Sequence, residues 1–371
     1  MERSNVYFTN LRTTPEKNIL QKLDGLVRKA GIEEINFKKQ YVAMKLHLGE
    51  PGNLAYLRPN YSKVIADLVK ELGGKPFLTD SNTLYVGRRK DALEHLDAAY
   101  ENGYNPFCTG CQVIIADGLK GSDEVLVPVP GGEFVKEAKI GRAVMDADIV
   151  ISISHFKGHE LSGFGGAIKN IGMGCGSRAG KMEMHSTGKP KVKLSRCRSC
   201  RKCAEGCAQD AITFREEGKA VIDMSLCVGC GRCLSLCPFD AISPADYESN
   251  EVMCKKMAEY TKAVLNGRPN FHISFVIDVS PYCDCHVEND LPVIPDIGIF
   301  ASNDPVALDQ ACAEAVMKAP VISGSLLEEK LRAGKKEDHF HTIHPDTHWQ
   351  ITLDHCEKLG IGNRQYKLIE V

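Results

Sequence analysis

Two cysteine runs decide how this sequence is read: CRSCRKCAEGC at 197–207 and CVGCGRCLSLCP at 227–238. Both follow C-x-x-C-x-x-C-x-x-x-C, the ligand spacing of bacterial two-cluster ferredoxins, in which the fourth cysteine of each run binds the other cluster. We therefore predict two [4Fe–4S] clusters. The predicted ligands are Cys197, Cys200, Cys203 and Cys237 for one cluster, and Cys227, Cys230, Cys233 and Cys207 for the other.

Zinc sites and disulfides are the alternatives for so many cysteines. Structural zinc closes with four ligands, usually in two pairs, whereas this chain has two complete four-cysteine runs. A disulfide scaffold is typical of short secreted chains, and this chain has 371 residues. Ala208 replaces the proline that usually follows the first run, but that proline supplies no ligand. Clusters remain the favoured interpretation.

Composition and charge argue against a nucleic-acid-binding protein and against a membrane protein. The formal net charge is −2 and no basic block dominates, which argues against binding of nucleic acid through its phosphates. The first residues lack the apolar core of a signal peptide, and no run reaches the roughly 18 to 20 apolar residues that a membrane span needs. We expect a cytoplasmic protein without membrane partners, in an anaerobic or strongly reducing cell that keeps cluster thiolates reduced.

Outside the cysteine runs, short apolar strands alternate with amphipathic helices. Strands are predicted at 41–49, 75–80 and 147–156, and the rhythm resumes after the cysteines with 271–280 and 296–302. Such alternation is typical of an α/β fold with a mostly parallel sheet. The predicted body comprises 1–189 plus 246–371, with a ferredoxin-like domain carrying two [4Fe–4S] clusters inserted at 190–245.

A second chemical centre is predicted at 154–185, SHFKGHELSGFGGAIKNIGMGCGSRAGKMEMH, directly after a strand. Ligands of open α/β sheets bind beyond the carboxyl ends of strands. Gly163, Gly165 and Gly166 would let backbone N–H groups hold an anion or anionic cofactor at the start of the next helix. The alternative is a glycine-rich turn with solvated basic side chains.

Two other loops should contribute to this pocket. Lys45 and His47 alternate onto one face of the predicted strand at 41–49, and Asp278 and Asp296 follow later strands. We expect one pocket that binds an anionic small molecule. Its predicted residues are His159, Lys169, His185, Lys45, His47, Asp278 and Asp296.

Five cysteines outside the runs have open interpretations. Cys175, Cys283 and Cys285 could ligate a further metal or could be reduced bystander thiols. Cys108 and Cys111 form an isolated C-x-x-C, which suits redox chemistry or metal binding but lacks a second pair nearby.

The chain resembles the family called domain of unknown function 362, in its form with an inserted bacterial ferredoxin module. The resemblance rests on KLHLGE at 45–50, SHFKGHELSGFGGAIKNIGMGC at 154–175 and DIGIFASNDPVALDQAC at 296–312. It therefore extends over most of the chain. It implies an iron–sulfur protein, but no particular reaction.

A weaker resemblance is to lactate racemase, the enzyme of the nickel-pincer nucleotide. His159, the G-x-G-G run, Lys169 and His185 are similar to that family in type and spacing. The resemblance implies that Lys169 tethers the cofactor, His185 binds nickel and His159 accepts a proton. His47 loosely matches the partner acid–base histidine.

Three functions are compatible with the sequence. The first is an iron–sulfur oxidoreductase that relays electrons between an external carrier of the ferredoxin or flavodoxin class and a substrate or cofactor in the crevice. The second is a non-catalytic electron-transfer or assembly protein. The third is a lactate-racemase-like isomerase with a metal cofactor and purely structural clusters.

Overall fold

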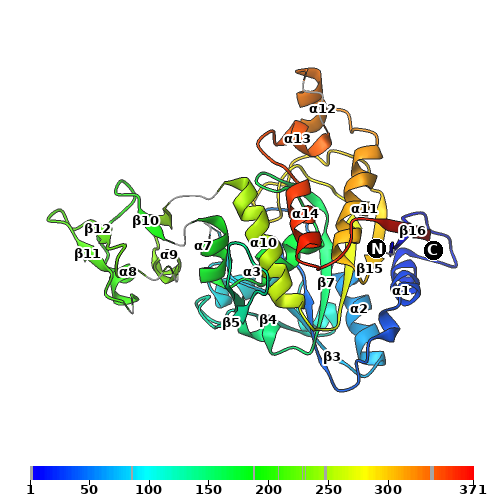
Figure 1. The fold of residues 1–371 in the computed structure, drawn as a ribbon, viewed down its shortest axis with the longest axis horizontal. Helices are drawn as coiled ribbons and strands as arrows, with labels where there is room; N and C mark the ends of the chain where they lie inside the picture. The colour runs from blue at the N-terminus through cyan, green and yellow to red at the C-terminus, as the bar shows by residue number, and fades with distance from the viewer. Residues whose placement is uncertain are drawn as a thin grey trace.

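The computed structural model describes residues 3–84, 87–186, 189–207, 209–227, 229, 231–245, 249–334 and 338–371. Its centre is an eight-stranded sheet with the order β16-β1-β15-β14-β7-β2-β3-β4 (Figure 1). The strands are β16 (Tyr366–Glu370), β1 (Ser4–Asn10), β15 (Gly298–Ser302), β14 (Asn270–Val276), β7 (Ile149–His155), β2 (Tyr41–Lys45), β3 (Lys75–Asp80) and β4 (Gln112–Ile115).

The sheet is mostly parallel, which confirms the predicted α/β class. Five consecutive strands, β14, β7, β2, β3 and β4, are mutually parallel. The exception is β15, which pairs antiparallel with both β1 and β14. Every residue of β7 is buried, because helices cover both faces of the sheet at its centre.

Helices form a layer on each face. On one side α1 (Ile19–Lys29) and α2 (Pro59–Glu71) share an apolar core with Ile149, Ile151 and Ile153 of β7. On the other side lie α6 (Ala167–Cys175), α10 (Asn250–Leu265), α11 (Pro305–Lys318) and α14 (Gln350–Lys358).

The start of α11 has a capping residue and a proline in the first turn. Asp304 accepts hydrogen bonds from the N–H groups of Val306 and Ala307, and Pro305 occupies the first turn. None of the helices that the structure describes is both long and apolar enough to cross a bilayer.

Shorter elements complete the body. They are η1 (Ile32–Glu34), α3 (Ala92–Glu101), α4 (Pro106–Thr109), β5 (Glu124–Pro128), β6 (Glu137–Gly141), α5 (Arg142–Met145), β8 (Lys157–His159), β9 (Gly163–Gly165), α7 (Arg178–His185), α12 (Leu326–Arg332) and α13 (His339–Ile343).

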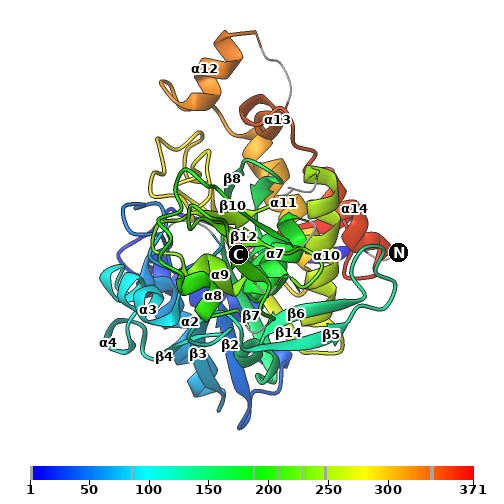
Figure 2. The same ribbon diagram turned by 90° about the vertical axis from the view of Figure 1, so that its left-hand side faces the viewer.

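The segment 190–245 forms a small lobe beside the body (Figure 1, left; Figure 2, facing the viewer). Its ends meet where β10 (Pro190–Val192) pairs antiparallel with β13 (Ile242–Pro244). Between them lie α8 (Lys202–Glu205), the β11 (Ile212–Phe214) and β12 (Ala220–Ile222) pair, and α9 (Arg232–Leu236).

The lobe has its own apolar core, which also contains two side chains of the body. Leu84 and Met182 belong to the same buried cluster as Cys197, Cys203 and Cys237. Lys90 of the body also forms an ion pair with Asp240 of the lobe. The lobe therefore packs against the loop after β3 and against α7.

Candidate functional site

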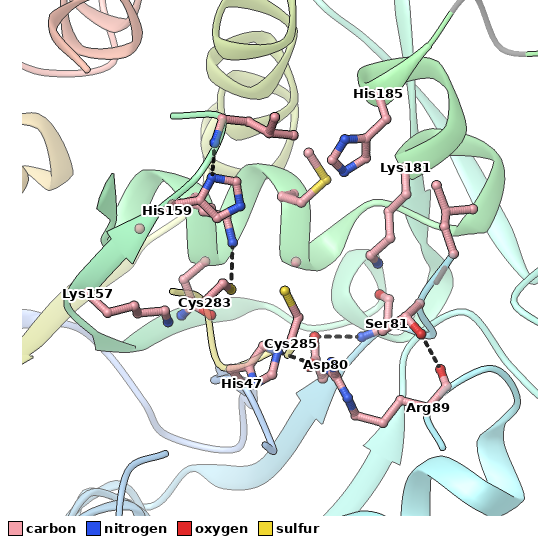
Figure 3. A pocket seen from close by; sticks show the side chains of 18 of the residues that line it. His47, Asp80, Ser81, Arg89, Lys157, His159, Lys181, His185, Cys283 and Cys285 are labelled. Carbon is pink, nitrogen blue, oxygen red and sulfur yellow. Dashed lines mark hydrogen bonds and ion pairs between the residues drawn. The ribbon is translucent and has the colours of Figure 1, made fainter. Parts of the chain in front are cut away.

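A cavity of about 100 Å³ opens at the carboxyl ends of β2, β3 and β7, bounded by α6, α7 and the loop after β14 (Figure 3). Parallel α/β sheets commonly bind ligands at this edge. Its basic lining residues are Lys45, His47, Arg89, Lys157, His159, Lys169, Lys181 and His185.

Lys45 and Asp80 form the floor of the pocket from the ends of adjacent strands. Lys45 Nζ lies 3.1 Å from Asp80 Oδ1 and donates to Asn170 Oδ1 at 2.9 Å. Burial alone would raise the pKa of the Asp80 carboxyl, but Lys45, then His95, lowers it below its usual value. A negative charge is therefore held at this end of the pocket.

His47 lies in the pocket but not on a strand. β2 ends at Lys45, so the prediction of a strand continuing to residue 49 was wrong. His47 Nδ1 faces the N–H of Gly49 at 3.0 Å, and Nε2 lies 3.0 Å from Arg89 Nη1. Burial and the Arg89 charge hold the pKa of His47 well below its usual range, so the ring is neutral.

Asp284 anchors the loop after β14 to the end of β7. Its carboxylate contacts His155 Nδ1 at 2.9 Å and Lys157 Nζ at 3.0 Å. Burial opposes the charged form, but His155 and Lys157 hold the pKa of Asp284 well below its usual range. This ion pair directs the Lys157 stem along the pocket wall.

The hydrogen bonds of His159 define its tautomer. Nδ1 accepts from the N–H groups of Leu161 at 3.2 Å and Ser162 at 3.1 Å. Burial, then the Lys169 charge, lowers the pKa of His159 to about 4, so the ring is neutral and carries its proton on Nε2. In this state His159 donates a hydrogen bond through Nε2, and its role as a proton acceptor stays a prediction.

The glycine turn does not offer free helix N–H groups as predicted. Asp309 Oδ1 accepts from Ala167 N–H at 2.7 Å, and Oδ2 accepts from Ile168 N–H at 3.0 Å. A Cβ on Gly166 would lie 2.3 Å from Asp309 Oδ1, which explains the glycine there. The carboxylate of Asp309 therefore occupies the site that we assigned to a ligand anion.

The other two glycines of the turn have different positions relative to the pocket. Gly165 lines the pocket, where a Cβ would approach the Lys169 side chain to 3.1 Å. Gly163 does not line it; it has a φ of +80° and lies against Trp349. Its role is to permit the tight turn between β8 and β9.

Two side chains of α7, Lys181 and His185, line the pocket (Figure 3). Lys181 Nζ donates to the Gly176 carbonyl at 2.6 Å, and burial lowers the pKa of Lys181 to about 8. Burial above all lowers the pKa of His185 to about 3.

Cys283 and Cys285 both line the pocket, next to Lys169. Lys169 Nζ donates to Cys283 Sγ at 3.1 Å. Cys175 does not join them, because its side chain is fully buried in the core between α6 and α10. Among the described residues, no group of three or more His, Cys, Asp or Glu side chains is arranged to hold a metal ion.

Asp278 and Asp296 lie apart from the pocket, contrary to our expectation. Neither lines it, and the Asp278 N–H donates to Asp296 Oδ1 at 2.7 Å. The C-x-x-C pair is also separate: Cys108 is exposed, whereas Cys111 is buried beside β4.

The cysteines of the lobe surround two further cavities. One is lined by Cys197, Cys200, Cys203 and Cys237. The other is lined by Cys207, Cys227 and Cys233, while Cys230 lies outside the described residues. Backbone N–H groups approach two of the sulfurs: Ala241 donates to Cys237 Sγ at 3.3 Å, and Gly229 to Cys227 Sγ at 3.4 Å.

Sequence reasoning missed four charged residues of the pocket, namely Asp80, Arg89, Glu160 and Lys181. Asp80 had a usable signal, since it is an acidic residue at the carboxyl end of a predicted strand. Arg89 lies in an irregular loop and Lys181 in a short helix. In such segments the sequence pattern does not show which way a side chain points.

A curated protein matches part of this chain. The chain is 29% identical over 131 residues to the thylakoid-associated protein sll1697 of Synechocystis sp., a match covering 34% of this chain and 35% of that protein. The matched region thus spans about a third of that curated relative.

Two solved structures match this chain at low structural similarity. The lactate racemase apoprotein from Thermoanaerobacterium thermosaccharolyticum matches with a TM-score of 0.40 and 14% identity, over 86% of this chain and 58% of that one. A Thermotoga maritima protein matches with a TM-score of 0.36 and 11% identity, over 71% and 51% of the respective chains.

A family model matches a longer part of the chain than the curated relative does. The model described as Domain of unknown function (DUF362) matches residues 42–314, which include the lobe and every residue named above as lining the central pocket. Because this match spans well over half of the sequence, the chain belongs to the DUF362 family.

Proposed function

We propose that the protein is an iron–sulfur oxidoreductase whose lobe binds two [4Fe–4S] clusters and whose central pocket binds the anionic small molecule that exchanges electrons with them. The carrying observation is the grouping of the cysteines. Three cysteines of the first run share a cavity with Cys237 of the second run, and Cys207 of the first run shares a cavity with Cys227 and Cys233.

This crossed grouping fits cubane clusters. In a [4Fe–4S] cluster each thiolate binds a different iron, so the ligands surround a cavity rather than converge on one point. The N–H groups of Ala241 and Gly229, which point at cysteine sulfurs, suit thiolates that carry negative charge. When bound, the clusters would supply one-electron transfer.

The pocket and the lobe share a wall, which supports their working together. Leu84 lines the pocket and also belongs to the apolar core of the lobe. On α7, Met182 enters the same core, while its neighbour Lys181 lines the pocket. A ligand in the pocket would therefore be separated from the lobe by a thin layer of protein.

The residues of the pocket suit a small carboxylate or phosphate. Lys157 on β8, Lys169 on α6 and Lys181 on α7 provide ammonium groups; Lys157 and Lys181 are buried and Lys169 is partly buried. Coulomb attraction is strong where water is excluded. The Nε2–H of His159 would donate to an oxygen of the ligand, which orients it.

An external electron carrier of the ferredoxin or flavodoxin class would complete the system. The lobe lies at one end of the molecule (Figure 1), and Cys200 in its first cavity is exposed. A carrier could therefore approach the lobe without entering the central pocket.

Anaerobic purification tests the cluster proposal. We expect about eight irons and an equal amount of sulfide per chain, with paramagnetic signals at low temperature after reduction. Cys203→Ser should lose part of the iron, whereas Cys108→Ser, a change at an exposed cysteine outside the lobe, should keep it all. Zinc in place of iron would overturn the proposal.

A second candidate, a metal-cofactor isomerase resembling lactate racemase, is favoured by one observation. His159, Lys169 and His185 all line the same pocket. This function predicts a covalent adduct on Lys169 that peptide mass spectrometry would detect, and activity that persists in the Cys203→Ser variant.

A further inference from the structure

Anion binding does not account for the two cysteines in the pocket. Cys283 and Cys285 follow β14 and both line the cavity (Figure 3). The residue between them, Asp284, is held by His155 at 2.9 Å and by Lys157 at 3.0 Å. Because the middle residue is anchored, the loop keeps both thiols on the same cavity.

Their spacing permits a disulfide. Residues two apart in a chain have Cα atoms at most about 7 Å apart, near the upper limit for a disulfide. A turn brings this segment below full extension, since His286 N–H donates to the Cys283 carbonyl at 3.0 Å. Both thiols are free in the structure.

The surroundings make the two thiols unequal. A hydrogen bond from Cys285, together with the charges of Lys169 and Lys157, holds the pKa of Cys283 well below its usual value despite burial. The same hydrogen bond, with burial, raises the pKa of the Cys285 thiol. At neutral pH the pair is therefore one thiolate and one thiol, the combination that thiol–disulfide exchange requires.

We propose that Cys283 and Cys285 form a thiol–disulfide redox couple that reacts with a disulfide entering the pocket. The Cys283 thiolate attacks one sulfur of the incoming disulfide, and the first thiolate product leaves and takes the proton of Cys285. Cys285 then attacks Cys283 Sγ, and the second product leaves and takes a proton from water. The protein gains one S–S bond and the substrate becomes two thiols.

This couple goes beyond the proposed function and needs no cluster. Lys169 is its positioning residue, because its ammonium lies 3.1 Å from Cys283 Sγ and neutralises the thiolate. The C-x-x-C pair provides an internal comparison, since burial raises the pKa of Cys111 and Cys108 is exposed.

The test equilibrates the full-length protein with mixtures of reduced and oxidised dithiothreitol, followed by acid quenching, alkylation and peptide mass spectrometry. We expect the Cys283–Cys285 disulfide to be about tenfold more abundant than a Cys108–Cys111 disulfide at the same ratio. In a separate incubation with oxidised glutathione, Cys285→Ser should accumulate a mixed disulfide between Cys283 and glutathione, with release of one reduced glutathione. Lys169→Met should slow its formation about tenfold, and Lys169→Arg should restore it.

The same measurement on Cys203→Ser separates this proposal from the cluster proposal. Retention of the disulfide in that variant supports a couple that is independent of the lobe. A wild-type protein with full iron content but no Cys283–Cys285 disulfide, or no mixed disulfide in Cys285→Ser, would overturn the couple and leave the iron–sulfur proposal intact.

Discussion

Lys45 Nζ lies 3.1 Å from Asp80 Oδ1, and the two side chains are 1% and 4% exposed. The pair ends the neighbouring parallel strands β2 and β3, so it joins the sheet to the floor of the pocket. Asn170 of α6 accepts a further hydrogen bond from Lys45 at 2.9 Å. Removing one member of such a buried ion pair destabilises the folded state, because the other charge stays buried without its partner.

Lys45→Met should therefore destabilise the protein by about 3 kcal/mol, because it leaves the Asp80 carboxylate buried with less compensation. Denaturant unfolding followed by circular dichroism would measure the loss. Lys63→Met is the control: it removes the exposed ion pair with Asp67. That change should cost no more than about 0.5 kcal/mol. Equal losses in the two variants would contradict the structural role of the buried pair.

Stability should also depend on pH through His159. Burial and Lys169 lower its folded pKa to about 4, below the ordinary histidine value of 6.5. As the pH falls below 6.5 the unfolded chain binds this proton first, so stability decreases until the pH reaches about 4. The contribution of His159 to this loss is about 3 kcal/mol.

His159→Asn keeps a side-chain acceptor for the N–H groups of Leu161 and Ser162 but cannot titrate. We expect this variant to lose about 3 kcal/mol less stability than the wild type between pH 6.5 and pH 4. His348→Asn, a change at an exposed histidine, should leave the pH profile unchanged. Parallel profiles for the wild type and His159→Asn would show that His159 is not the titrating group.

The sequence predicted the repeating strands and helices but not their order in the sheet. Periodicity is a local signal, and it placed a strand at 75–80, where β3 lies. The antiparallel position of β15 depends on pairing with β1 and β14, which are far away in the chain. No local pattern encodes such a pairing.

The pocket shows the same limit. The position of these residues after predicted strands correctly indicated that His159 and Lys169 lie in one pocket at the edge of the sheet. The helix N–H groups after Gly166 were assigned to a ligand, yet they bind Asp309, a residue 142 positions from Ala167. A buried side chain from a distant helix can replace a ligand, and sequence spacing cannot reveal it.

Anion binding should weaken at alkaline pH because of Lys181. Burial lowers its pKa to about 8, so an increasing fraction of Lys181 is neutral as the pH rises through that value. Calorimetry with oxalate should give an affinity about tenfold weaker at pH 9 than at pH 7. Lys181→Met should bind weakly at both values, whereas Lys120→Met, a change at an exposed lysine, should behave like the wild type. A wild-type affinity that does not change with pH would rule out Lys181 as the anion contact.

The lobe should be removable, because β10 and β13 bring Pro190 and Pro244 together as paired residues. Replacing 190–244 by a short Gly-Ser linker should therefore leave an α/β body that unfolds cooperatively in denaturant. The deletion uncovers Met182, which the lobe core buries completely, so Met182→Gln should be included to limit aggregation. The full-length Met182→Gln variant is the control for the substitution itself. If the shortened protein lost cooperative unfolding while that control kept it, the lobe would be an integral part of the body's core.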